Sequence, residues 1–491
     1  MEESKLLHRD FQGNILLVLL LNAIIKPLYL LGIDRGVQNV IPPEEYGVYF
    51  TLFNLSFIYQ IIADVGLQAW LTRTCAQHHS EARMLYPYFL SLKAVLSLLY
   101  LILTSLTAFI LGFGSEYPLF LALILLLQLS NSFLLFLRAA ISGIGLYRMD
   151  SYLSVTDRGL SILLMGLFLV IPALQSSITI ILFTSVQLLT ILLATGIAVM
   201  ILRRHDFSFQ LKFDLTRLKS LLHEGIPYAT LVLLMSASSR MDTILIPFFS
   251  TGKFNGVAIY ASSFRIVEAV NIIGYLFAGL LLPLFTKSIQ QLEMTSKLAD
   301  MAIRFLWTLM IPLAFGFSVY AAGIIPLLYK NATNEMINTF SIGILTIIPI
   351  SGNYIYGTLL TASGSLWPMN RIFVWILGIN MVLILLLLPF MSVPGVALAS
   401  LITQSMAFIL QLNLCLKKQL VKTSFLLVRR IFLFSLFTGL CIFSVHYFLP
   451  LTFSNLPVLL FIGLIITGIS MITTGMINKN EWQPLFKETI N

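Results

Sequence analysis

The chain consists almost entirely of apolar runs of roughly 20 residues separated by short polar segments. A run of that length is what an α-helix needs to cross the ~30 Å hydrocarbon core of a bilayer. The runs are continuous rather than alternating, which excludes the strands of a membrane β-barrel. With 58% hydrophobic and only 10% charged residues, a soluble globular protein is excluded as well. The sequence therefore predicts an all-α polytopic membrane protein.

About fourteen transmembrane spans are predicted. They cover residues 14–39, 46–72, 86–113, 117–142, 151–174, 178–202, 225–250, 256–286, 301–325, 338–363, 366–390, 393–416, 427–449 and 456–477. The first run is long enough to span and contains Lys26. We therefore expect a retained first helix rather than a cleaved signal peptide.

The basic residues between the spans predict the orientation. If the amino terminus is cytoplasmic, the inner segments hold nineteen Lys and Arg residues, whereas the outer loops hold only Lys253 and Lys330. Cytoplasmic loops are enriched in Lys and Arg. We therefore expect both termini in the cytoplasm of a multi-pass protein. The formal net charge of +9 follows from these loops, so no nucleic-acid partner is expected.

The longest polar segment, residues 203–224, divides the predicted spans. Its part from Asp214 to Glu224 repeats apolar residues at helical spacing, which predicts an amphipathic linker on the inner membrane surface. We expect residues 1–202 to form an amino-terminal lobe of six spans and residues 225–416 a second lobe of six. Residues 417–491 add two more spans and a tail.

A short internal echo relates the two lobes. Asp34-Arg35 precedes Tyr46-Gly-Val-Tyr49 at the start of the second span, and Arg240-Met-Asp242 precedes Gly256-Val-Ala-Ile-Tyr260 at the start of the eighth. Transporters are often built from repeats of this kind, with the substrate site between them.

Ionisable side chains lie inside several of the spans. A charge at bilayer depth costs ~3 kcal/mol or more, so such a residue usually faces the bundle interior or a watery cavity. Cations outnumber carboxylates at these positions, which favours an anionic substrate. The candidate substrate-binding cations are Lys26, Arg35, Arg240 and Arg265.

Four carboxylates are candidates either for binding a coupling Na⁺ or H⁺ or for structural pairing: Asp34, Asp64, Asp242 and Glu268. Arg265 and Glu268 are three residues apart on a helix, so they share a face and can pair. Asp64 lies well inside the second span, where its protonation or ion occupancy would decide whether it is tolerated. The alternative for Asp64 is a structural partnership with Lys93 or Arg138.

The charges in the inner halves of the spans could form a cytoplasmic gate as readily as they could bind substrate. These residues are Lys93, Arg138, Asp157, Arg158 and Arg371. For Arg138 and Arg371 a third interpretation is that they simply snorkel to the interface.

No motif of a catalytic or metal site is present in the sequence. It has no Walker loop, no HExxH and no Ser/His/Asp arrangement. Cys75, Cys415 and Cys441 lack the spacing of a disulfide framework or a metal site. We therefore expect no enzyme activity, no metal and no cofactor beyond a coupling ion.

Short motifs in the spans resemble bacterial polysaccharide flippases. Glu45-Tyr-Gly-Val-Tyr49, Ala63-Asp-Val-Gly-Leu67 and Arg73 are similar to the start of these proteins, and Arg240-Met-Asp-Thr followed by Gly256-Val-Ala-Ile-Tyr-Ala-Ser-Ser-Phe-Arg265 is similar to the start of their second lobe. The family comprises the O-antigen and exopolysaccharide transporters of the multidrug/oligosaccharidyl-lipid/polysaccharide superfamily.

The resemblance implies two six-helix lobes forming a V, plus two extra helices. It implies movement of an undecaprenyl-pyrophosphate-linked oligosaccharide from the inner to the outer leaflet of the cytoplasmic membrane. We expect the protein to be a monomer. The other expected partners are membrane lipids, a polysaccharide polymerase and a chain-length regulator. The family's cationic lumen would correspond to Lys26, Arg35, Arg240 and Arg265. A pyrophosphate needs cationic partners, and Arg offers bidentate geometry for phosphate oxygens.

Three other functions remain open. A cation-coupled drug antiporter of the same superfamily would have twelve spans and a cavity richer in carboxylates. An integral-membrane polysaccharide polymerase or ligase would have a long outer loop with catalytic Arg or His. The third is a membrane assembly factor without transport activity.

Overall fold

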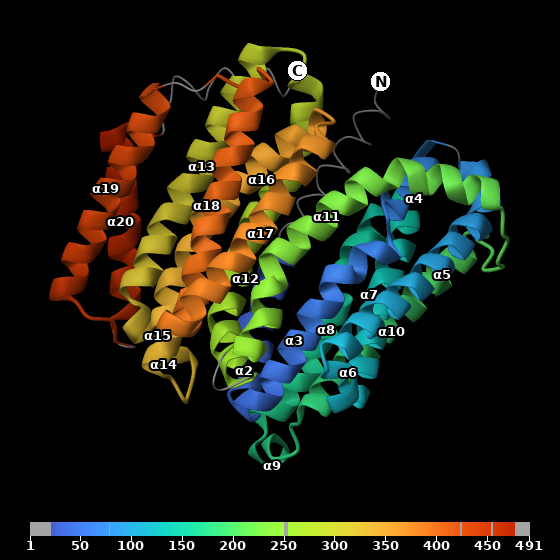
Figure 1. The fold of residues 1–491 in the computed structure, drawn as a ribbon, viewed down its shortest axis with the longest axis horizontal. Coiled ribbons are helices and arrows are strands. Elements are labelled where there is room, and N and C mark those ends of the chain that lie inside the picture. Colours follow the sequence, from blue (N-terminus) through green and yellow to red (C-terminus); the bar gives the residue numbers. More distant parts are fainter. Residues whose placement is uncertain (1–20, 78, 250–253, 423–424, 453–454, 477–491) are drawn as a thin grey trace. The chain divides into compact units, whose positions relative to one another are not determined.

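The computed structural model describes residues 21–77, 79–249, 254–422, 425–452 and 455–476. Every regular element in these ranges is a helix (Figure 1). Thirteen helical segments of the described chain are long and apolar enough to cross a membrane, and each overlaps one predicted span. The first predicted span begins outside the described residues and is helical from residue 21 to Gln38. The all-α polytopic architecture is therefore confirmed.

The chain forms two compact units, one ending at Ala258 and the other beginning at Ile259. The helical elements of the first unit are η1 (Tyr29–Asp34), α2 (Arg35–Gln38), α3 (Pro43–Tyr59), η2 (Gln60–Ala63), α4 (Leu67–Gln77), α5 (His79–Ile110), α6 (Phe113–Glu116), α7 (Pro118–Gly143), α8 (Tyr147–Val170), α9 (Pro172–Gln175), α10 (Ile180–Arg204) and α11 (Leu215–Phe249). Helix α12 (Phe254–Ser288) contains the boundary between the units.

The second unit continues with a further set of helices. They are α13 (Leu292–Val319), α14 (Ala321–Leu328), α15 (Asn334–Gly343), η3 (Ile344–Thr346), α16 (Ile347–Ala362), α17 (Leu366–Met391), α18 (Val393–Lys417), α19 (Phe425–Phe448) and α20 (Leu456–Thr474). The tail from residue 477 and the loop residue Lys253 lie outside the described residues.

In the first unit α7 is the central helix, packing against α4, α8 and α10. The segment after α10 stays attached to this unit through aromatic contacts. The rings of Phe207 and Phe209 lie with their centroids 5.0 and 5.5 Å from that of Tyr86 on α5. Residues 205–214 of the predicted linker are not helical, and α11 begins at Leu215 and runs without a break through the seventh predicted span. That the start of α11 lies on the membrane surface remains a prediction.

The second predicted span, residues 46–72, is interrupted, so the prediction of one continuous helix there is wrong. Helix α3 ends at Tyr59 and continues as η2, which ends at Ala63, and α4 begins at Leu67. Between them Val65 and Gly66 have φ values of 44° and 80°. The left-handed region ends a helix, and for a β-branched residue such as Val it is an outlier. Asp64 therefore lies at a break rather than inside a regular helix.

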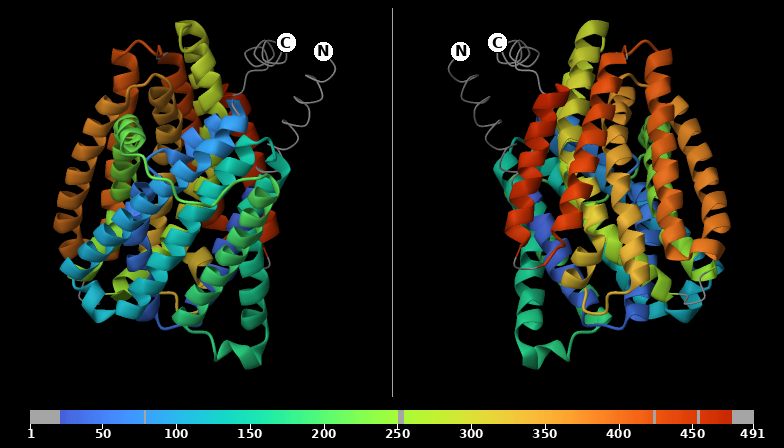
Figure 2. Two further views of the ribbon diagram at one scale, coloured as in Figure 1. Left: turned by 90° about the vertical axis from the view of Figure 1, so that its right-hand side faces the viewer. Right: turned by 90° about the vertical axis from the view of Figure 1, so that its left-hand side faces the viewer.

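In the second unit α18 packs against α15, α16 and α17. Buried amides join two of these helices: Asn353 Nδ2 donates to Gln404 Oε1 at 3.1 Å, and Gln411 Nε2 donates to Asn353 Oδ1 at 2.9 Å. Helices α19 and α20, at the red end of the colour scale, pack on each other and on α13 (Figure 2). They add to the outside of this unit, in agreement with the two extra spans that the sequence predicts.

Candidate anion-binding site

Three cations of the first unit share one neighbourhood. Lys26 comes from the first helix, Arg138 from α7 and Arg158 from α8. Among the described residues, Arg158, Arg138 and Asp157 act electrostatically on Lys26. We call Lys26, Arg138 and Arg158, together with Asp150 and Asp157, the amino-terminal cationic cluster.

Each arginine of the cluster touches a carboxylate on α8. Arg138 Nε lies 2.7 Å from Asp150 Oδ1, and Arg158 Nε lies 3.3 Å from Asp157 Oδ2. Lys26 takes part in no ion pair between residues that the structure describes. Three cations against two carboxylates leave the cluster with an excess of positive charge.

The cluster is only partly desolvated. The side chains of Arg138 and Asp150 are each 19% exposed, and that of Arg158 is 26% exposed. Fully buried charges pay a large desolvation penalty, and charges that keep part of their exposure pay less. Such partial exposure suits a site that binds an ion and then releases it.

A π-helical turn positions the aromatic wall of the cluster. Tyr29 opens η1, directly after Pro27 and Leu28, and the Arg158 guanidinium carbon lies 4.5 Å from the centroid of its ring. Short π-helical segments inside α-helices are rare and are frequent at functional sites. The face of an aromatic ring attracts a guanidinium group, and this contact orients Arg158.

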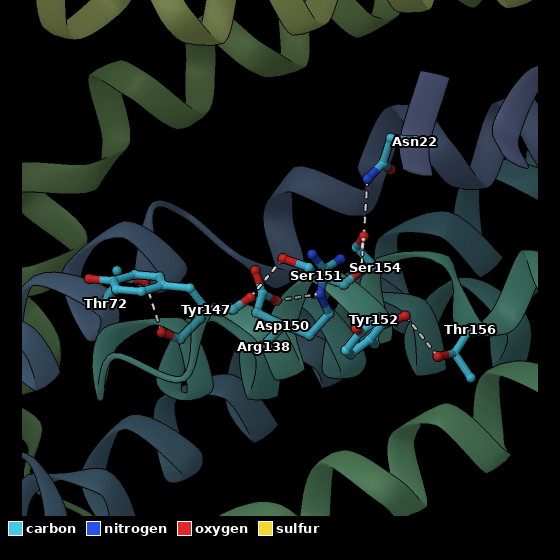
Figure 3. A network of polar contacts seen from close by, with 10 residues as sticks. Asn22, Thr72, Arg138, Tyr147, Asp150, Ser151, Tyr152, Ser154 and Thr156 are labelled. Atoms are coloured by element: carbon cyan, nitrogen blue, oxygen red, sulfur yellow. Dashed lines mark hydrogen bonds and ion pairs between the residues drawn. The ribbon is translucent and has the colours of Figure 1, made fainter. Parts of the chain in front are cut away.

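The polar face of α8 results from residue spacing. Ser151, Ser154, Asp157 and Ser161 are three or four residues apart, so they share one side of the helix, and all four are buried. Asn22 Nδ2 on the first helix donates to Ser154 Oγ at 3.0 Å (Figure 3). The same figure shows Arg138 reaching Asp150 beside this contact. Ser154 thus joins α8 to the first helix next to the cationic cluster.

The motif at the start of the second span has a structural explanation. Tyr46 Oη donates a hydrogen bond to Oδ1 of Asp34, which is buried. Gln187 Nε2 on α10 donates to Tyr49 Oη at 3.1 Å. Between these tyrosines, Gly47 faces the backbone carbonyl of Phe254. Asp34 therefore has a structural partner within the first unit, and its expected role in ion coupling stays a prediction.

Arg35 and Arg240, two of the predicted substrate cations, lie elsewhere in the first unit. The Arg35 Nε atom, on α2, is buried. Arg240 on α11 donates to Asn54 Oδ1 and lies 3.9 Å above the Phe57 ring, which joins α11 to α3. Asp242, two residues further on, is buried. These contacts hold helices together, and a contact with substrate stays a prediction for these residues.

The remaining candidates of the second unit are Arg265, Glu268 and Arg371. Arg265 Nη1 lies 3.0 Å from Glu268 Oε2, so the pair expected from their spacing is present. The Arg265 side chain is only 4% exposed, and Arg371 on α17 is exposed. Substrate binding by Arg265 and gating by Arg371 remain predictions.

Lys93 and Asp64 occupy the break in the second span. Lys93 Nζ donates to the Ala63 carbonyl oxygen at 2.7 Å and to Ser132 Oγ at 2.5 Å. Asp64 Oδ1 accepts the Gln68 backbone N–H at 3.3 Å and acts electrostatically on Lys93. The partnership that the sequence suggested for Lys93 and Asp64 is thus an electrostatic one.

The candidate residues lie in other groups in the structure than the sequence analysis gave them. The sequence made Lys26 a candidate for substrate binding and made Arg138, Asp157 and Arg158 candidates for a cytoplasmic gate or for substrate contacts. The structure assigns all four to one cluster, and both roles stay predictions. Tyr29 and Asn22 were not expected there. The serine spacing on α8 was the one local signal for this face, because no sequence pattern shows which helix lies opposite.

Comparison with known proteins identifies the family of the chain. A family model described as "Polysaccharide biosynthesis protein" matches residues 14–289, more than half of the chain. No curated protein sequence matches the chain. The family match supports the resemblance seen in the short motifs over residues 14–289.

Solved structures with the same fold include a flippase and transporters. A lipid II flippase, MurJ, in an inward closed conformation matches with a TM-score of 0.68 at 14% identity, covering 93% of this chain and 98% of its own. A mutant of the Vibrio cholerae MATE transporter VcmN matches with a TM-score of 0.57 at 15% identity, covering 86% and 99%. A MOP superfamily transporter from Pyrococcus furiosus, described as having a binding pocket of reverse polarity, matches with a TM-score of 0.57 at 15% identity, covering 82% of this chain and 95% of its own. At these identities the likeness establishes the fold.

Proposed function

The chain belongs to the polysaccharide biosynthesis protein family, and from that premise we propose that it is a flippase for an undecaprenyl-pyrophosphate-linked oligosaccharide. It carries this lipid from the cytoplasmic to the outer leaflet of the bacterial inner membrane, for O-antigen or exopolysaccharide biosynthesis. Both the family and the fold are those of transporters rather than of catalytic enzymes. The substrate, the direction and the biosynthetic role are the proposed part.

The observation that supports this function is the amino-terminal cationic cluster. A pyrophosphate diester carries negative charge on two adjacent phosphoryl groups, and Lys26, Arg138 and Arg158 offer three positive charges. The planar guanidinium group can bind two phosphate oxygens at once, whereas Lys acts as a point charge. We propose that the arginines bind the phosphate oxygens of the pyrophosphate. Lys26 adds positive charge but does not fix the orientation of the pyrophosphate.

Asp150 and Asp157 have a definite role in this proposal. Their oxygen atoms lie 2.7 and 3.3 Å from the guanidinium nitrogens of Arg138 and Arg158. When the pyrophosphate arrives, phosphate oxygens replace part of these contacts, and when it leaves the carboxylates return. Binding is therefore an exchange of anionic partners, which keeps it weak enough for release during alternating access.

A drug antiporter of the same superfamily is the nearest rival, because MATE transporters share the fold. An organic cation would meet a net repulsion at three cations and two carboxylates. The Pyrococcus furiosus transporter is described as having a binding pocket of reverse polarity, so proteins of this fold differ in the charge of their pockets. The charge of the cluster therefore favours an anionic substrate over a cationic drug.

The test compares charge-removing and charge-keeping variants in a host whose surface polysaccharide depends on this chain. Lys26→Gln and Arg158→Gln should each lower export about tenfold or more, because a hydrogen bond to a charged group contributes about 1.5–3 kcal/mol and each ~1.4 kcal/mol is tenfold in affinity. Lys26→Arg should retain most export. Arg158→Lys keeps the charge but loses the bidentate geometry and should be intermediate.

Arg83→Gln is the matched control, because Arg83 forms an exposed ion pair with Asp206 at 3.5 Å and is not part of the cluster. It should export normally at equal protein abundance. If Lys26→Gln and Arg158→Gln exported as much polysaccharide as wild type at equal protein abundance, the cluster would not be on the substrate path. Resistance to organic cations that depends on the same residues would favour the antiporter.

A further inference from the structure

The break in the second span gathers oxygen atoms around one nitrogen. The segment from α3 through η2 ends at Ala63, and a helix that ends leaves its last carbonyl oxygens without backbone donors. The negative end of the helix dipole lies at the same place. Ala63 is fully buried, so its carbonyl needs a partner from the protein.

Lys93 supplies that partner from another helix. Its Nζ atom lies 2.7 Å from the Ala63 carbonyl oxygen and 2.5 Å from Ser132 Oγ. Lys93 and Ser132 are 1% and 2% exposed. The ammonium group thus connects η2, α5 and α7 in an environment without bulk water.

A carboxylate completes the surroundings of the ammonium group. Asp64 follows Ala63 directly, acts electrostatically on Lys93, and accepts the N–H of Gln68 at the start of α4. A buried charge is tolerated only when it is compensated. The break therefore presents a backbone carbonyl, a hydroxyl and a nearby carboxylate to one positive charge.

The same kinds of oxygen bind free cations in other membrane proteins. Where transmembrane helices are broken, unwound carbonyls and the carboxyl ends of half-helices coordinate Na⁺ or H⁺. We propose that the break at Asp64 is a monovalent-cation site whose resident cation is the Lys93 ammonium group. The tethered ion occupies the site permanently and stabilises the strained turn at Val65, which has φ of 44°.

This assignment does not depend on the identity of the transported lipid. It predicts that the oxygen atoms remain a cation site when the tethered ion is removed. A Lys93→Ala variant should then bind a free monovalent cation in the vacated space, with methylammonium the closest mimic of the lost group and Na⁺ and K⁺ as alternatives. The simpler explanation is that Lys93 is only a hydrogen-bond donor, for which charge is dispensable.

The experiment measures thermal unfolding of the purified full chain in detergent, at constant ionic strength, in choline chloride, methylammonium chloride, NaCl or KCl. Wild type should unfold at the same temperature in all four salts. Lys93→Ala should unfold at a lower temperature in choline chloride and regain at least half of the loss, saturably, in one of the smaller cations. Lys93→Ala combined with Asp64→Asn should regain none.

A failure of all small cations to stabilise Lys93→Ala would overturn the proposal, as would equal recovery in the double variant. If Lys93→Ala yields no folded protein, Lys93→Gln decides, because it keeps a donor and removes the charge. A clear fall in its unfolding temperature supports a cation site. An unfolding temperature equal to that of wild type shows that the charge is dispensable and ends the proposal.

Discussion

Gly47 controls how closely the second span packs within the first unit. A Cβ atom at this position would lie 2.0 Å from the carbonyl oxygen of Phe254 and 2.8 Å from its carbonyl carbon. Both are backbone atoms, so no rotamer change can make room. The perturbation is Gly47→Ala, which adds one methyl group and changes nothing else.

The expected cost follows from this distance. Non-bonded heavy atoms settle at about 3.5 Å or more, so α3 and the Phe254 backbone must move apart by roughly 1.5 Å. Overpacking of this kind costs about 1–3 kcal/mol and occasionally more. The neighbours are fully buried, Tyr46 against Asp34 and Tyr49 against Gln187, so the movement disturbs them too. We expect a loss of about 3 kcal/mol.

Reversible unfolding in mixed detergent measures this loss, and Gly196→Ala is the matched control. Gly196 lies in α10 with no atom within 4 Å of an added Cβ. Its replacement should leave stability unchanged or raise it by up to ~1 kcal/mol, because Gly is the poorer helix former. Equal stability of Gly47→Ala and Gly196→Ala would refute the close approach of α3 to Phe254.

Three further substitutions test other parts of the structure by the same measurement. Tyr46→Phe removes a hydrogen bond to the buried Asp34 carboxylate and should cost about 1.5–3 kcal/mol; an unchanged stability would show that the hydroxyl is not needed. Val65→Gly should be neutral or stabilise by about 1 kcal/mol, because it relieves the positive φ, and a clear loss would contradict the strained turn. Asn353→Leu should cost about 1–2 kcal/mol by leaving Gln411 without its acceptor, whereas no loss would mean that the network is replaceable.

The helical framework could be predicted because the bilayer imposes it. A membrane span must be long, apolar and helical, so composition and run length were enough to locate the thirteen segments found in the described residues. The interruption at Asp64 was not predicted, because Val65 and Gly66 stand in an otherwise apolar run. Neither residue ends a helix by necessity, and the positive φ of Val65 depends on tertiary contacts.

The members of the cationic cluster could be predicted as charges inside spans, but their association could not. The position of Lys26, Arg138 and Arg158 within apolar spans was enough to predict that each places a charge inside the membrane at a cost in free energy. Their association depends on which helices are neighbours, and no local pattern encodes that. The partner of Asp34 was missed for the same reason, although Tyr46 stood in the motif that carried the family resemblance.

The proposed transport depends on the cationic cluster binding the pyrophosphate of a lipid-linked oligosaccharide that the chain moves across the membrane. The most direct measurement is reconstitution in liposomes with that lipid, labelled on the sugar and detected by a membrane-impermeant reagent. Wild type should make the label accessible on the opposite leaflet, and Lys26→Gln and Arg158→Gln should slow this tenfold or more, with Arg83→Gln as fast as wild type. Equal rates for all four proteins, or for liposomes without protein, would contradict this role of the cluster.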